Sequence, residues 1–333
     1  DTDRSRGLGD VYKRQTVNVG VDFALFRHRL SGTIEYYNKY SVDLLAAING
    51  SPTQGFGYTT LMTNNGKMVN RGVEITLSGE IIRQKDFSWN ASLLYAFNRN
   101  KVKHISVQPS LWDSRISMPT SYPMVGKPLY GIYAYKWAGL NENGDPQVYD
   151  AENNVTSGPA RDYHALVYCG TTVPIHNASL TNVLRYKGFE FSAMLILDAG
   201  HKLRSSNIPS INMSNGRITS TAKGIVDRWT QPGDVTDVPR LLFSNDTENF
   251  NTHRTELYRY SDLFVYDASN IRLSNISLAY RVPAHWCKKI SLSGARLQFN
   301  VENVATFAFD SKANYDLGGK VKPNYVWGLY LNC

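Results

Sequence analysis

The sequence contains little charge and no long apolar run, and each shortage excludes a class of protein. Charged residues make up 19% of the 333 residues, below the roughly 25% usual in soluble domains. No apolar run is longer than five residues, which excludes both a membrane-spanning helix of about 20 apolar residues and the core of a signal peptide. A membrane β-barrel remains possible, because its strands carry their apolar residues in alternation.

The sequence also lacks motifs for catalysis and for binding metals or cofactors. The three cysteines, Cys169, Cys287 and Cys333, form no CxxC pair. Their number and spacing do not indicate whether the protein resides in an oxidising or a reducing compartment. The seven histidines form no metal-binding motif, and no phosphate-binding or dinucleotide-binding loop occurs. Asn141, which opens the segment NENGD, resembles the start of a calcium loop, but Pro146 stands where such a loop needs glycine. We therefore expect no metal, no cofactor and no enzymatic activity.

The positive charge does not indicate nucleic-acid binding. Lysine and arginine together number 36 against 28 acidic residues, which gives a net charge of +8. These cations are scattered in ones and twos, whereas a phosphate backbone requires a clustered basic face. We expect no nucleic-acid partner.

What the sequence does contain is period-two alternation of apolar and polar residues, which is typical of β-strands. In the segment TVNVGVDFALF, for example, Val17, Val19 and Val21 share one face and Asn18 and Asp22 the other. The pattern predicts nine long strands, at residues 16–26, 30–40, 67–79, 87–98, 176–186, 188–200, 269–280, 296–302 and 325–331.

Strand length and charge placement indicate a membrane barrel. Soluble strands average about five or six residues, whereas tilted membrane strands need about nine to eleven. In the clearest strands the charged residues lie on one face only, as expected where the other face meets lipid. The carboxylates Glu74, Glu190, Asp198 and Glu302 stand on separate strands, so we expect them to line a lumen and not to form a glycosidase pair.

The connections between strands alternate in length. Those after odd-numbered strands are mostly short and basic, whereas residues 41–66, 99–175, 201–268 and 305–323 form long connections. Short periplasmic turns and long extracellular loops have this asymmetry in outer-membrane barrels. Within the long loops, Asn143-Gly144 predicts a two-residue hairpin between residues 130–137 and 147–149, and residues 220–229 form the only plausible helix.

Aromatic residues have two expected uses. Phe87, Trp89, Tyr95, Phe97, Tyr325 and Trp327 lie near strand ends and predict an interfacial girdle. Loop aromatics either pack the loops together or present flat faces to a ligand or partner. The candidates for such contact are Trp112, Tyr122, Tyr130, Tyr133, Tyr135 and Trp137.

The order of several motifs resembles the C-terminal part of the barrel in SusC/RagA-type TonB-dependent outer-membrane transporters. The resemblance covers residues 16–333 and lies in NVGVDFALF (18–26), RLSGTIEYYNKYSVDLL (29–45), TNNGKMVNRGVEITLSG (63–79), FSWNASLLYAFNRNKV (87–102), VGKPLYGIYAYKWAGLNENGDPQVYD (125–150) and DASNIRLSNISLAYRVP (267–283). Residues 1–15 show no strand pattern, and we interpret them as a non-native leader.

The resemblance implies an all-β fold: a partial, antiparallel, up-and-down transmembrane barrel with about nine C-terminal strands of roughly 22. The plug and the N-terminal domains of the family are absent from the sequence. The resemblance further implies a Gram-negative outer-membrane protein, in contact with lipid, that imports oligosaccharides or peptides. Such import would be energised by the TonB complex, through the absent N-terminal part, and assisted by a SusD-like surface lipoprotein. A passive porin-like barrel and a soluble β-rich glycan-binding domain are the alternatives.

Overall fold

A nine-stranded antiparallel sheet dominates the fold. The computed structural model describes residues 13–49, 60–105, 113–158, 162–213, 222–243, 252–289, 291–317 and 322–332. The strands follow one another in the order β1-β2-β3-β4-β10-β11-β16-β17-β18, each paired with its neighbours along the chain. Their bounds are β1 Lys13–Leu25, β2 Leu30–Asn49, β3 Thr60–Arg83, β4 Phe87–His104, β10 His176–Tyr186, β11 Phe189–Ala199, β16 Asn270–Arg281, β17 Gly294–Ala308 and β18 Asn324–Asn332.

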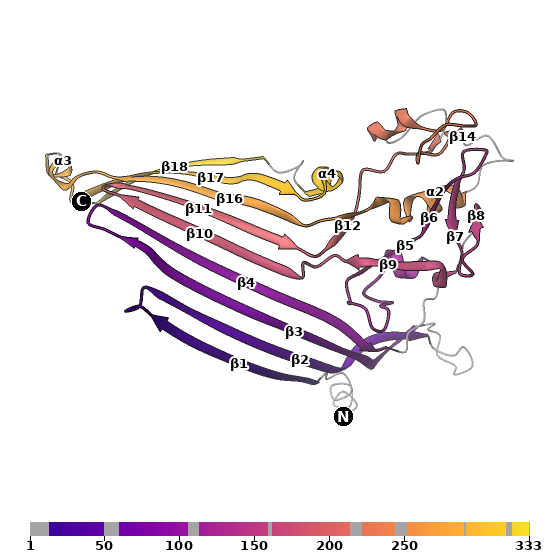
Figure 1. Cartoon of the computed structure of the whole chain (residues 1–333), viewed down its shortest axis with the longest axis horizontal. Coiled ribbons are helices and arrows are strands. Elements are labelled where there is room, and N and C mark those ends of the chain that lie inside the picture. Colours follow the sequence, from indigo (N-terminus) through magenta and orange to yellow (C-terminus); the bar gives the residue numbers. More distant parts are fainter. Residues whose placement is uncertain are drawn as a thin grey trace, which may run out of the picture.

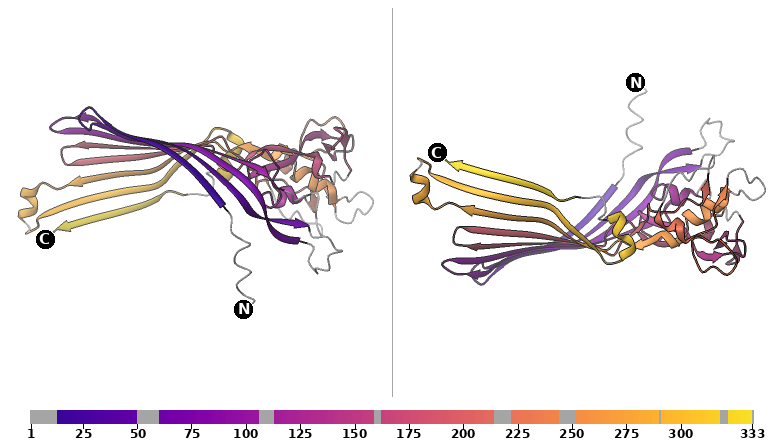
Figure 2. Two further views of the ribbon diagram at one scale, coloured as in Figure 1. Left: turned by 90° about the horizontal axis from the view of Figure 1, so that it is seen from below. Right: turned by 90° about the horizontal axis from the view of Figure 1, so that it is seen from above.

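The sheet is a curved, open section of barrel wall and not a closed ring (Figures 1 and 2). All nine predicted strands are present, and the antiparallel up-and-down order is as predicted. The short connections and the small helix α3 (Ala284–Lys288) lie at one end of this wall, and the long connections fold together at the other end (Figure 1). None of the helices in the described part of the chain has the length and apolar character to span a membrane.

The alternation of the sequence places large apolar side chains on one face of the wall. Val17, Val19 and Val21 are 57%, 62% and 63% exposed, and the register pairs Val19 with Tyr36 and Val21 with Ile34 on the same face. This face is called the outward face below. Asp22 of β1 and Glu35 of β2 lie on the opposite, lumen face. An apolar surface of this extent matches the lipid-facing band of a barrel.

Two strands are longer than the sequence predicted. We expected β2 to end at Tyr40 and β3 to begin at Lys67, but the ladder continues to Asn49 and Thr60. The register shifts between Ser41 and Leu44, and Asp43 has a φ of 57°. A bulge of this kind reverses which residues share a face, so the period-two signal ends while the hydrogen-bonded ladder goes on.

The strand β1 begins at Lys13, three residues before the start that we predicted, and Lys13, Arg14 and Gln15 pair with β2. Residues 1–12 lie outside the described residues, and the non-native leader stays a prediction.

The long connections contain the remaining elements. Small sheets pair β5 with β9, β6 with β7 and β8, β12 with β15, and β13 with β14. The strand bounds are β5 Gly131–Tyr135, β6 Trp137–Leu140, β7 Pro146–Tyr149, β8 Val155–Thr156, β9 Leu166–Thr171, β12 Lys202–Arg204, β13 Asn212–Met213, β14 Leu242–Phe243 and β15 Val265–Asp267. The helices are α1 Ser114–Ser117, α2 Thr252–Arg259 and α4 Asn314–Leu317, with 3₁₀ turns η2 Tyr163–Ala165, η3 Lys223–Asp227, η4 Asp262–Phe264 and η5 Ser311–Ala313.

The prediction of a two-residue hairpin between residues 130–137 and 147–149 was wrong. The hairpin joins β6 to β7 through residues 141–145, with Leu140 opposite Pro146, so its connection is longer than two residues. Gly144 has a positive φ of 73° whereas Asn143 does not, and a two-residue type I′ turn needs both. In addition, β5 pairs with β9 and takes no part in this hairpin.

The helix expected at residues 220–229 is wrong for the part that the structure describes, residues 222–229, where Lys223–Asp227 form a 3₁₀ turn. The longest helix among the described residues is α2. The α2 segment lies against β7. Its position in the loops shows that tertiary packing, more than its own sequence pattern, stabilises it.

Candidate functional site

The loop connections between β4 and β10 and between β11 and β16 form a compact unit at one end of the wall, called the loop assembly below (Figure 1). Its main core contains Tyr133, Tyr135, Val148, Ala165, Leu166 and Leu257. A second cluster joins Ile211, Tyr258 and Phe264. Both loops contribute to the first core, so the two long connections fold as one unit.

The candidate contact residues occupy different positions in this assembly. Tyr133 and Tyr135 are each only 1% exposed, and Tyr122 is 8% exposed. Trp137 is partly buried against both clusters, Tyr130 is 49% exposed, and Trp112 lies outside the described residues. Packing, one of the two uses left open by the sequence, therefore describes the first three tyrosines. Contact with a partner or cargo stays a prediction.

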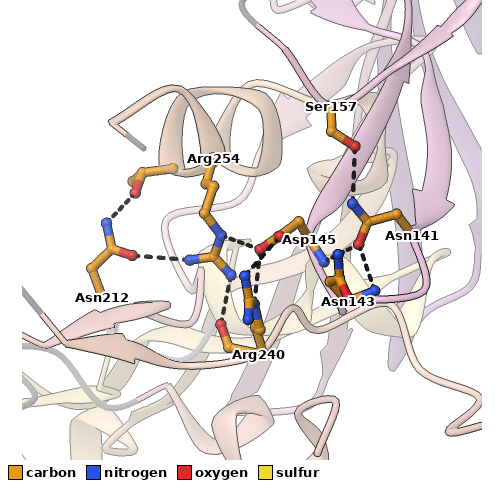
Figure 3. Close-up of polar contacts among 8 residues, drawn as sticks. Asn141, Asn143, Asp145, Ser157, Asn212, Arg240 and Arg254 are labelled. Carbon is orange, nitrogen blue, oxygen red and sulfur yellow. Dashed lines mark hydrogen bonds and ion pairs between the residues drawn. The ribbon is translucent and has the colours of Figure 1, made fainter. Parts of the chain in front are cut away.

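A buried polar network holds the β6–β7 hairpin to α2 (Figure 3). Asp145 accepts hydrogen bonds from Nε of Arg254 at 2.7 Å and from the NH2 group of Arg240 at 2.9 Å. Arg254, whose side chain is 3% exposed, also donates to Oδ1 of Asn212 and to the carbonyl of Arg240. Burial lowers the pKa of Arg254 and the nearby Asp145 carboxylate raises it. The guanidinium remains charged, and its Nε, NH1 and NH2 groups each donate a hydrogen bond.

The Asp145 carboxylate is therefore engaged by arginines. Asn141 accepts hydrogen bonds from the backbone N–H groups of Asn143 and Asp145, so it shapes the turn (Figure 3). No group of three or more potential ligand side chains that could hold a metal occurs among the described residues.

Residues 222–243 lie across the β6–β7 hairpin and complete the distal tip of the assembly. The indole N–H of Trp137 donates to Asp237 at 3.0 Å, and the backbone N–H of Arg240 donates to the carbonyl of Gly144. A Cβ atom on Gly144 would lie 2.4 Å from the ring of Trp229. This contact and the positive φ both require glycine at position 144. Val226 and Val235 of the same segment are 74% and 102% exposed.

The lumen face of the wall carries paired charges. Glu190 accepts hydrogen bonds from Arg185 at 2.7 Å and from Arg296 at 3.0 Å. Asp198 pairs with Arg272 at 2.9 Å. These pairings place two of the four predicted carboxylates in cross-strand ion pairs, the arrangement expected of a polar wall.

The cysteines do not form a reactive site within the described residues. Cys169 in β9 and Cys287 in α3 are free thiols. Burial, together with the nearby Asp262, raises the pKa of Cys169 to about 11. This thiol stays protonated at neutral pH and is a poor nucleophile. Cys333 lies outside the described residues.

Sequence reasoning missed the arginines that organise the loop assembly. Arg240 and Arg254 lie 95 and 109 residues from Asp145, and neither belongs to a recognisable motif. The only available signal was the clustering of polar residues around Asp145 in the turn, which does not identify a partner so far away.

Comparison with known proteins gives a consistent result. The family model described as TonB dependent receptor-like, beta-barrel matches residues 12–304. TonB-dependent receptor P3 from Formosa agariphila is 25% identical over 94% of this chain and 32% of its own length. TonB-dependent receptor SusC from Bacteroides thetaiotaomicron is 24% identical over 87% of this chain and 28% of its own length.

A solved structure described as the RagAB peptide transporter superposes on the chain with a TM-score of 0.74, at 21% identity, over 96% of this chain and 35% of that one. The chain thus spans about a third of the length of its relatives. The open nine-stranded wall, its apolar outward face and the family match together show that the chain belongs to the TonB-dependent receptor-like β-barrel family.

Proposed function

We propose that this chain is part of an outer-membrane active transporter of Gram-negative bacteria that imports oligosaccharides or peptides. Import draws energy from the TonB complex, which acts through a part of the protein outside this sequence. A SusD-like surface lipoprotein docks on the loop assembly. One observation carries the proposal: the wall has an apolar outward face, and a large folded loop assembly lies at only one end of its strands (Figure 1).

The loop assembly supports recognition outside the cell. Closing a barrel needs only short turns, as at the other end of the wall, where Lys187 and Gly188 suffice to join β10 to β11. Long loops with a packed core of their own usually carry function. The peptide part of the cargo class is supported by a structural neighbour that is described as a peptide transporter.

The distal tip of the assembly is the candidate docking surface for the lipoprotein. Val226 and Val235 are exposed there, on a segment fixed to the β6–β7 hairpin through Trp137, Gly144 and Asp237. Exposed aliphatic groups on a rigid support suit the centre of a protein interface.

The test is co-purification of the lipoprotein with the full-length transporter carrying Val226→Asp and Val235→Asp. Charges at the centre of an interface disfavour docking, so we expect at least a tenfold loss of bound lipoprotein, equal to about 1.4 kcal/mol. The control is Val167→Asp, at a residue of β9 that is 39% exposed. Uptake of radiolabelled oligosaccharides and peptides by cells carrying each variant identifies the cargo.

Undiminished co-purification with the double variant would contradict docking at the tip. Uptake that persists after deletion of the TonB gene would contradict active transport and favour the passive-barrel alternative. Deleting the whole hairpin is a poorer test, because it would remove Val148 from the core and Asp145 from its arginines.

A further inference from the structure

A cavity of about 670 Å³ opens where residues 69–71 in the middle of β3 and the loop end of β4 meet residues 126–128 and 168–175. Five cationic residues are among its lining residues, with the ring of Tyr168 beside them: Arg71, Arg99, Lys101, Lys103 and Lys127. No carboxylate lines it in the described part of the chain. The cavity is distinct from the lumen charges described above.

The strand register places the wall cations on the outward face. Tyr36, Val73 and Phe97 form one cross-strand row on that face. The next outward row, two residues nearer the loop assembly, contains Asn38, Arg71 and Arg99, and Lys101 follows one row later. The outward face therefore changes from apolar to cationic within two rows.

The depth of this change matches the membrane surface. The strand β4 runs from Phe87 at the short-turn end to Phe97 in about eleven residues, and a tilted membrane strand needs about nine to eleven. Aromatic side chains mark membrane interfaces, and Tyr95 and Phe97 lie around His176 at this level. Arg99, Lys101 and Lys103 come directly after it, where lipid headgroups lie.

The positive charge of these cations is not neutralised by carboxylates of the described residues. Arg71 donates from Nε to the side-chain oxygen of Asn38 at 3.3 Å, and Nζ of Lys127 lies 4.9 Å from the centre of the Tyr168 ring. Across the described ranges, none of the five cations forms an ion pair with an acidic side chain. By contrast, Glu190 and Asp198 on the lumen face form ion pairs with arginines.

The cluster is local to one part of the wall. At the corresponding end of β17 the outward face carries Phe307 and Phe309, which are 60% and 62% exposed. A general attraction to the membrane surface would not require a cavity with five cations at β3 and β4. A bound anion explains both the cavity and the concentration of charge.

We propose that this cavity binds the phosphate groups of an anionic lipid headgroup in the outer leaflet of the membrane. Arg71 and Arg99 present planar guanidinium donors suited to phosphate oxygens, and the lysines add point charges. The acyl chains extend along the apolar rows below, toward Tyr36 and Val73. Cargo inside the lumen does not reach Arg71, Arg99 and Lys101, because these side chains lie on the other face of the wall.

The test uses the full-length receptor in phosphatidylcholine nanodiscs, titrated with bisphosphorylated lipid A and followed by native mass spectrometry. Each cation near a membrane surface contributes about a fivefold gain in binding, so Arg99→Gln with Lys101→Gln should weaken lipid A binding by about 25-fold. Lys39→Gln is the matched control, since Lys39 lies next to Asn38 but on the lumen face. Heat-modifiable migration checks that each variant has a folded barrel, separately from lipid binding.

Retention of lipid A by the Lys39→Gln variant, with its loss from the double variant, supports the site. Equal binding of dephosphorylated lipid A would overturn phosphate recognition. Inorganic phosphate that binds the receptor as tightly as lipid A would assign the cavity to a free anion and overturn the lipid proposal. Equal weakening by Lys39→Gln would show that the outward assignment is wrong.

Discussion

The barrel wall and the loop assembly use their apolar residues in opposite ways. On the wall the large apolar side chains point outward, with Val21 63% and Trp327 78% exposed. In the loop assembly they point inward, with Tyr133 and Tyr135 each 1% exposed. Both hydrophobic core clusters found in the described residues belong to the loop assembly. One chain therefore contains a region whose large apolar side chains are exposed and a region that buries them in a core of its own.

Charged groups differ between the two regions in the same way. Arg185 on the lumen face is 53% exposed while it pairs with Glu190, and such exposed pairs contribute little stability. Arg254 in the loop assembly is 3% exposed and bonded to Asp145. A buried charge that loses its partner is costly. Ion pairs therefore contribute more to the stability of the loop assembly than to that of the wall.

The sharpest test of this contrast is Arg254→Ala in the full-length protein. Removing the guanidinium leaves Asn212 and the Arg240 carbonyl without their buried donors and removes one of the two arginines that bind Asp145, at a cost of about 3–5 kcal/mol. Hydrogen exchange should accelerate in β7 and α2 and stay unchanged in β10 and β11. Arg240→Ala, at a side chain that is 26% exposed, should have a smaller effect. Equal effects of the two variants would count against burial as the cause.

The wall is tested by Leu195→Arg against Ser192→Arg. Leu195 lies on the outward face, in register with Leu180 and Leu273, and an arginine near the bilayer midplane costs about 2–4 kcal/mol. We expect the Leu195 variant to lose most of its heat-modifiable outer-membrane form. The Ser192 variant, on the lumen face, should assemble normally. Equal membrane yields would show that the two faces were assigned the wrong way round.

A smaller, pH-dependent effect is expected at the junction of the two regions. Burial opposes ionisation of Asp267, but hydrogen bonds from Ser269 and Lys202 lower its pKa to about 2. The unfolded value is about 3.9, so the stabilisation is complete above that pH and is lost as the pH falls toward 2.

Asp267→Asn should therefore flatten the acid dependence of hydrogen exchange in β12 and β15, which pair at this residue. Lys202→Gln, which keeps the Ser269 hydrogen bonds, should flatten it only in part. An acid dependence that is identical in wild type and Asp267→Asn would assign it to other groups.

The sequence predicted the wall well because strand alternation is a local property. Each of Val17, Val19 and Val21 reaches the outward face through the period-two geometry of its own strand, whatever lies next to it. The alternation failed where bulges occur, as between Ser41 and Leu44. There the hydrogen bonds of the neighbouring strand, and not the pattern, carry β2 onward to Asn49.

The loop assembly was predicted only as long connections rich in aromatic residues. Its structure depends on contacts between distant segments, such as Arg254 with Asp145 and Tyr258 with Ile211. No spacing rule relates these residues, so the sequence left open whether Tyr133 and Tyr135 pack in a core or face a ligand.

The sequence by itself thus determined the strand order, the apolar face of the wall and the family of this protein, because each depends on short-range alternation or on motif order. Tertiary structure alone decided which loop aromatics are buried and which arginines hold Asp145. It also brought Lys127 to the strand cations Arg71, Arg99 and Lys101 around one cavity. These features arise when segments more than 100 residues apart meet, and the free energy of such contacts depends on burial that a linear pattern does not encode.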